Sequence, residues 1–206
     1  MFYHASDTKG IDVLKPMGED GLVYFSTKRE NTLVYLVNAV KKFCRDSGIK
    51  FEGAHWGPYG FSQDGKIRIS EYYKDAFEKT YKGESAYIYM AEDVLDSGDC
   101  KYIRDVATSK EPVKVSGVEF VPDAYEAILE AERKGLIEIV RYESMSEKDR
   151  EWHERTIREE YKNATTNDYK AFLLANFAEL LQGMDCDTCI SFEIKRNKNE
   201  SSNHSV

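Results

Sequence analysis

The residues that could do chemistry gather near the start of the chain. His4 lies in the segment FYHAS (2–6), and Tyr24 lies in VYFST (23–27). Both segments are rich in aromatic residues and typical of β-strands, whereas chain starts are usually loose and polar. A histidine can exchange hydrogen bonds with a hydroxyl, and a tyrosine ring can stack on a flat group. The two residues therefore indicate a binding site, and the alternative for each is ordinary packing within a sheet.

The order and spacing of these residues resemble the start of the ADP-ribosyltransferase fold. The resemblance is closest to its H-Y-E branch, which includes poly(ADP-ribose) polymerases and diphtheria toxin. There a first strand carries histidine, a small residue (usually glycine) and Ser or Thr, as His4, Ala5 and Ser6 do here. A second strand carries tyrosine before phenylalanine and runs into a helix, as at Tyr24. In polymerase-like members another tyrosine stands eleven positions further on, which is Tyr35 in this chain.

This resemblance implies that NAD is the substrate. Tyr24 and Tyr35 would then clamp the flat nicotinamide ring between aromatic faces. Backbone groups at Ala5 would recognise the carboxamide, and His4 would bond to the ribose beside the nicotinamide. The Ser6 hydroxyl would contact the adenosine half. We therefore expect all five residues to bind NAD, with His4 and Tyr24 also counted as catalytic.

The chemistry that the resemblance implies also needs a carboxylate. Cleavage of the nicotinamide–ribose bond passes through an oxocarbenium-like state, whose positive charge a nearby carboxylate stabilises. The family takes this glutamate from a later strand, and Glu119 in VKVSGVEFVPDAY is the candidate. The alternative is an outward-facing strand residue, and alternation leaves this open because both faces of the segment carry apolar residues. Glu111, Glu138 and Glu143 are weaker candidates at strand ends.

Strand and helix signals surround the predicted site. The pattern predicts strands at 2–6 and 22–26, followed by a single helix over 27–48. Thr27 and Glu30 have capping-box spacing at its start, and Gly48 is typical of a helix end. The helix would bury one apolar face, formed by Leu33, Leu36, Val37, Val40 and Phe43.

The rest of the chain mixes strands and helices without a repeating unit. Asp123, Glu126 and Gly135 mark both ends of a helix. We expect strands at 83–92, 111–121 (one or two) and 136–142, and helices at 122–135, 147–161 and 169–181. This order predicts an α+β fold with a mixed, mostly antiparallel sheet. We expect one domain over 1–194 and a polar, disordered tail over 195–206.

Composition limits the classes of function. The chain has 206 residues, of which 37 are acidic and 29 basic, for a net charge of -8. That charge argues against bulk nucleic-acid binding, which needs Lys and Arg to replace counterions on phosphate. No apolar run is long enough to span a bilayer and no signal peptide is present, so we expect no membrane contact. The four scattered cysteines indicate a reducing, cytoplasmic location.

Other motifs carry weaker signals. Cys186 and Cys189 have the spacing of half a zinc site, but a full site needs two more ligands, so we predict no metal. The loop 53–61, GAHWGPYGF, could be a substrate-facing lid or a plug packed over the sheet. Trp152 is expected to anchor a charged helix, with His153 on its solvated face. Common nucleotide, protease and hydrolase motifs are absent.

Three functions remain open. The first is an NAD-binding enzyme that transfers ADP-ribose to an unknown macromolecular acceptor or hydrolyses NAD. The second is a catalytically silent module of the same fold that recognises a nucleotide or a protein partner. The third, a 2′-phosphotransferase acting on RNA, would need a cluster of arginines that the motifs do not supply. The oligomeric state does not follow from the sequence.

Overall fold

Two sheets of different composition organise the computed structural model, which describes residues 1–17 and 20–184. The larger is a five-stranded antiparallel sheet, and in it β1 (Phe2–Ser6) pairs with β3 on one side and β6 on the other. In spatial order its strands are β7 (Val106–Ser109), β3 (Val23–Ser26), β1, β6 (Ala86–Ala91) and β9 (Gly117–Val121). The strands predicted at 2–6, 22–26 and 83–92 are thereby confirmed, and the segment 111–121 forms two strands.

The second sheet makes the architecture mixed, as predicted. It has three strands, β10 (Ile137–Val140), β5 (Ile67–Ser70) and β4 (Tyr59–Phe61). The β10–β5 pair is parallel and the β4–β5 pair is antiparallel. A short antiparallel pair joins β2 (Val13–Leu14) to β8 (Val113–Lys114).

The single helix predicted over 27–48 is wrong. The structure has a 3₁₀ helix, η1 (Glu30–Tyr35), and a separate α1 (Ala39–Ser47). Asn38 adopts an extended conformation between them, and its side chain accepts hydrogen bonds from the first backbone N–H groups of α1. Asn38, a strong capping residue within an apolar, helix-like pattern, therefore divides the predicted helix in two. Gly48 ends α1 with a positive φ of 69°, as predicted.

The remaining helices agree with the sequence patterns. In α3 (Ala124–Arg133), Asp123 accepts hydrogen bonds from two first-turn N–H groups, and Gly135 follows with positive φ. α4 (Glu147–Asn163) and α5 (Asn167–Leu181) also form where expected. The short α2 (Ala76–Tyr81) and η2 (Tyr142–Ser144) were not predicted.

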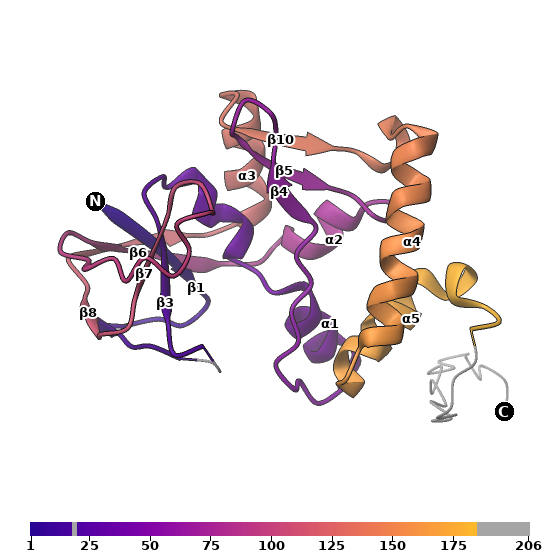
Figure 1. Ribbon diagram of the computed structural model, residues 1–206, viewed down its shortest axis with the longest axis horizontal. Helices are drawn as coiled ribbons and strands as arrows, with labels where there is room; N and C mark the ends of the chain where they lie inside the picture. The colour runs from indigo at the N-terminus through magenta and orange to yellow at the C-terminus, as the bar shows by residue number, and fades with distance from the viewer. Residues whose placement is uncertain (18–19, 185–206) are drawn as a thin grey trace, which may run out of the picture.

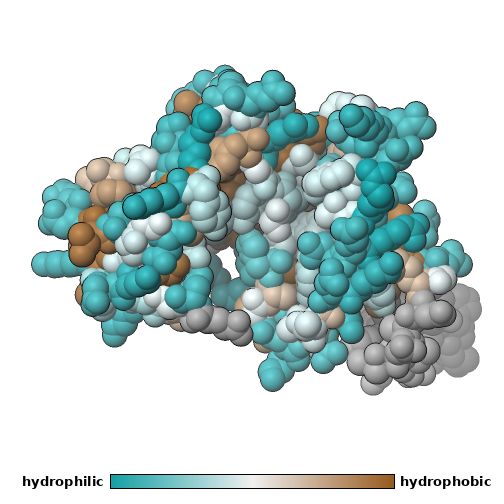
Figure 2. Space-filling view, viewed as in Figure 1, coloured by the Kyte–Doolittle hydropathy of each residue, from teal (hydrophilic) through white to brown (hydrophobic). Residues whose placement is uncertain are grey.

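The elements form two bodies side by side (Figure 1). In one, η1 and α3 pack on one face of the five-stranded sheet, while the other face packs against residues of β2 and β8. In the other, α1, α4 and α5 enclose a separate apolar core around Trp56. Hydrophilic residues cover the outer face of α4 (Figure 2). Across the two described ranges, no helix is both long and apolar enough to cross a membrane.

Candidate functional site

His4 and Tyr24 lie next to each other across the β1–β3 boundary. The His4 Nδ1 atom lies 2.8 Å from the carbonyl oxygen of Tyr24. Because a carbonyl only accepts, Nδ1 carries the proton and donates it. Burial lowers the pKa of His4, so the imidazole is neutral at neutral pH and Nε2 has a free lone pair. Among the described residues Nε2 has no partner, so it can accept a hydrogen bond from a hydroxyl.

This bond lies where the five-stranded sheet loses its regular pairing. β1 and β3 pair in register at one position, Tyr3 with Ser26, whereas β1 pairs with β6 along its whole length. The same register would next pair Ala5 with Tyr24, but that pair does not form. The His4 ring binds the Tyr24 carbonyl instead. The result is a gap in the pairing of the two strands at Ala5.

The register places the predicted residues on the two faces of the sheet. Ala5 lies opposite Ile88, which lies opposite Glu119, so these side chains share a face with η1. Tyr24 shares that face, because its neighbours Val23 and Phe25 pack into the core on the other one.

His4 alternates to the opposite face, where its ring lies 6.0 Å from that of Phe25. Glu119 lies two strands from β1, which is about 10 Å at the usual strand spacing. The structure therefore brings His4 and Tyr24 together, while Glu119 is a separate group on the Tyr24 face.

Glu119 is held by an arginine that the sequence reasoning missed. Both carboxylate oxygens accept hydrogen bonds from Arg29, one of them from Nε at 2.7 Å. These bonds hold the pKa of Glu119 below its usual value, so the carboxylate is ionised at neutral pH. Arg29 immediately precedes η1, and no pattern in the sequence relates it to a strand ninety residues away. The pair is about one-third exposed, so a ligand can reach it.

Tyr35 belongs to an aromatic cluster above the same face. It lies on η1, half exposed, and its ring meets that of Tyr59 edge to face at 4.9 Å. The Tyr59 hydroxyl lies 2.7 Å from Nε2 of His55. Two of these residues come from the loop 53–61, while its Trp56 is buried in the helical core. In that loop Trp56 packs into the core, while His55 and Tyr59 belong to the aromatic cluster around Tyr35.

A buried amide lies on η1, the 3₁₀ helix that packs on the Ala5 face of the sheet. Asn31 on η1 is only 5% exposed, and its Nδ2 has no hydrogen-bond partner among the described residues. Just past Ser6, a cavity of about 760 Å³ begins at Asp7 and extends along α1. Ser6 itself accepts a hydrogen bond from the backbone of Thr8.

Two expectations about other residues have clear outcomes. Trp152 is 52% exposed and His153 only 7% exposed, the reverse of the predicted anchor and solvated face. His153 is buried because its ring stacks on Tyr72 at 3.7 Å. Cys186, Cys189 and the tail 195–206 lie outside the described residues. Among the residues that the structure describes, no cluster of His, Cys, Asp and Glu could hold a metal ion.

Comparison with known proteins gives no relative. No protein-family model, no curated protein and no solved structure matches the chain.

Proposed function

We propose that the protein binds NAD at the gap between β1 and β3 and acts as an ADP-ribosyltransferase-like protein. NAD is the substrate, and ADP-ribose passes to a macromolecular acceptor or to water. The observation that carries this proposal is the unformed Ala5–Tyr24 pair with His4 bound across it. A carboxamide has the donor and acceptor of a peptide group, so it can take the place of a missing strand partner.

The surrounding groups suit the rest of the molecule. The rings of Tyr24 and Tyr35 are both partly exposed, so each can stack on the nicotinamide. The free Nε2 of His4 accepts a hydrogen bond from a ribose hydroxyl, and the unpaired Nδ2 of Asn31 is available as a further donor. The adenosine half extends past Ser6 toward the cavity that begins at Asp7.

In the proposed reaction the carbon–nitrogen bond between ribose and nicotinamide breaks. Its electron pair leaves with the nicotinamide, which becomes neutral, and C1′ takes on oxocarbenium character. For the ionised Glu119 to stabilise that positive charge, its pairing with Arg29 must loosen and the ribose must extend across β6 toward β9, about 10 Å from β1. Water or an acceptor nucleophile then attacks C1′ and loses a proton.

The Arg29–Glu119 pair favours a second candidate, a catalytically silent module of the same fold. An arginine bound to both carboxylate oxygens neutralises the charge that the reaction needs. If the pair persists with ligand bound, the site recognises a nucleotide without cleaving it.

Nicotinamide release from NAD separates the two candidates, with cell extract supplied as a source of acceptors. Glu119→Gln keeps the size of the side chain and removes its charge, so we expect unchanged NAD affinity and roughly hundredfold slower release, about 3 kcal/mol. Glu126→Gln, at an exposed glutamate on α3, serves as the matched control and should release nicotinamide at the parent rate. Equal release by the parent and Glu119→Gln would remove Glu119 from the mechanism. No release by any variant, with NAD still bound, would establish the silent module.

A further inference from the structure

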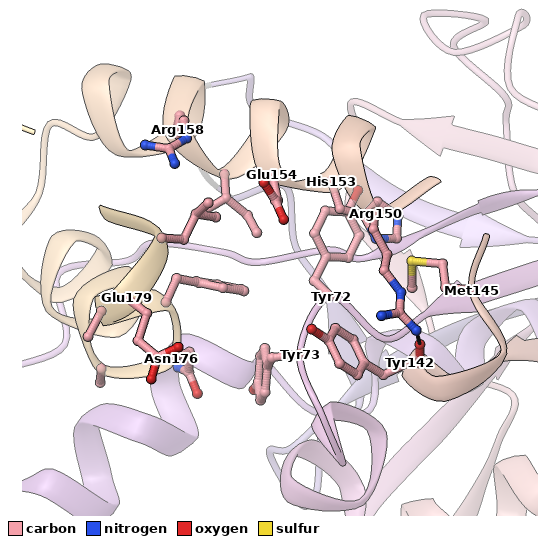
Figure 3. A pocket seen from close by; sticks show the side chains of 15 residues that line it. Tyr72, Tyr73, Tyr142, Met145, Arg150, His153, Glu154, Arg158, Asn176 and Glu179 are labelled. Atoms are coloured by element: carbon pink, nitrogen blue, oxygen red, sulfur yellow. Dashed lines mark hydrogen bonds between the residues drawn. The ribbon is translucent and has the colours of Figure 1, made fainter. Parts of the chain in front are cut away.

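A second cavity lies at the opposite end of the molecule from β1, between α4, α5 and the residues after β5 (Figures 1 and 3). Its volume is about 600 Å³, within the usual range of small-molecule sites. None of the residues predicted to bind NAD lines it. The cavity is therefore separate from the proposed NAD site, and a ligand bound in it does not require NAD.

Aromatic rings form one wall of this cavity. Tyr72 stacks on His153 with an interplanar angle of 16°, and Tyr73 meets Phe177 edge to face at 5.3 Å. α5 departs from helical geometry at Phe177, which lines the cavity. Such rings bind flat, unsaturated groups by stacking.

α4 contributes charged groups that have no counterion. Neither Arg150 nor Arg158 forms an ion pair with any described carboxylate, and Glu154 between them pairs with no described cation. Arginines elsewhere in the fold are mostly paired, including Arg29, Arg45, Arg133 and Arg141. Arg150 lies over the ring of Tyr142 at 5.2 Å and donates to its carbonyl oxygen at 3.4 Å. Its remaining donors are available to an anion.

These three residues follow one another at four-residue steps, so they lie along one face of α4 (Figure 3). The two arginines are about 12 Å apart along the axis, at about 1.5 Å per residue. The cavity thus offers cationic groups toward both ends and a carboxylate, which only accepts hydrogen bonds, between them.

Two polar groups that line the cavity have unused hydrogen-bonding capacity, one on the buried His153 and one on the partly exposed Asn176. His153 is 7% exposed, and its Nδ1 has no hydrogen-bond partner among the described residues. The Nδ2 of Asn176 donates to the carbonyl of Phe172, which leaves its Oδ1 free to accept. A buried polar atom without a partner is costly, so a ligand that supplies one is favoured.

We propose that this cavity binds a nucleoside monophosphate. The phosphate is bound by Arg150, whose guanidinium fits its oxygens in a bidentate manner. The sugar hydroxyls donate to Glu154, and the base stacks on the tyrosines. Only a ligand that combines a flat base, hydroxyl donors and an anion satisfies all three kinds of group.

Calorimetric titration of the full chain with AMP tests this site, with adenosine and inorganic phosphate as partial probes. We expect saturable AMP binding, and binding at least roughly tenfold weaker for each partial probe, because each lacks one set of contacts. Arg150→Ala should weaken AMP binding by a similar factor. The matched control is Arg155→Ala, an exposed arginine on the same helix that does not line the cavity, and it should bind like the parent.

Three results would overturn the proposal. The first is no saturable heat with AMP at millimolar concentration. The second is equal binding by Arg150→Ala and Arg155→Ala, which would place the AMP elsewhere. The third is inorganic phosphate or adenosine binding as tightly as AMP, because a site that contacts base, sugar and phosphate together must bind AMP more tightly than either part.

Discussion

His153 is held in its neutral form by the residues around it. Burial against Tyr72 lowers the pKa of the imidazole, and the positive charge of Arg68 lowers it further, while Asp149 acts in the opposite direction. Protonation therefore favours the unfolded state. The stabilisation from a neutral His153 is present above the usual pKa of 6.5 and is lost as pH falls through the lowered value.

We expect the thermal unfolding midpoint to fall as the pH is lowered from about 7 to about 5, and to fall less in His153→Phe. Phenylalanine keeps a flat ring on Tyr72 but does not titrate. Each unit by which folding lowers the pKa is worth about 1.4 kcal/mol. His4 and His55 also have pKa values lowered by burial, so a residual slope persists in the variant. The same slope in the variant and the parent would contradict this role of His153.

The capping signals of two elements permit a direct comparison. Asp123 accepts three backbone hydrogen bonds, two at the start of α3 and one from Gly83. Thr27 has the same kind of sequence signal but caps nothing, since η1 has no side-chain cap. We expect Asp123→Ala to lower the free energy of unfolding by about 1 to 2 kcal/mol and Thr27→Ala by less than about 0.5 kcal/mol. Urea denaturation measures both, and equal losses would contradict the observed boundaries.

These helices also show what the sequence can and cannot predict. α3 was predictable because Asp123 and Gly135 act on their own neighbours. The break at Asn38 was not predicted, because the apolar pattern continues through it, although Asn38 is itself a local capping residue. Its amide also donates to the carbonyl of Ala54, a contact that the sequence does not indicate. Likewise β7 pairs with the distant β3, and β5 pairs in parallel with the distant β10. The local pair of β4 and β5 was missed because both strands are short.

The same limit applies to the candidate site. His4 and Tyr24 were predicted together because a local motif carries each of them and the β1–β3 pairing is close in sequence. The partner of Glu119 depends on a contact between Arg29 and a distant strand, which no local pattern encodes. Which face of α4 is buried depends on its contact with Tyr72. The sequence pattern therefore could not predict that His153 is buried and Trp152 exposed.

At the scale of the whole molecule, the sheet body and the helical body each carry one proposed site. The gap at Ala5 lies in the five-stranded sheet, and the cavity along α4 lies in the helical body (Figure 1). Trp56 of the loop 53–61 packs into the helical core, while Tyr59 of the same loop contacts Tyr35 above the sheet. This loop therefore links the two bodies.

Calorimetric titration with NAD tests most directly whether NAD binds at the gap beside Tyr24. We expect saturable binding by the parent, severalfold weaker binding by Tyr24→Ala and near-parent binding by Tyr24→Phe, because ring stacking is worth about 0.5 to 1.5 kcal/mol. Trp152→Ala, at a half-exposed aromatic residue on α4 in the helical body, is the matched control and should bind like the parent. No heat at millimolar NAD, or equal binding by Tyr24→Ala and the parent, would contradict the account.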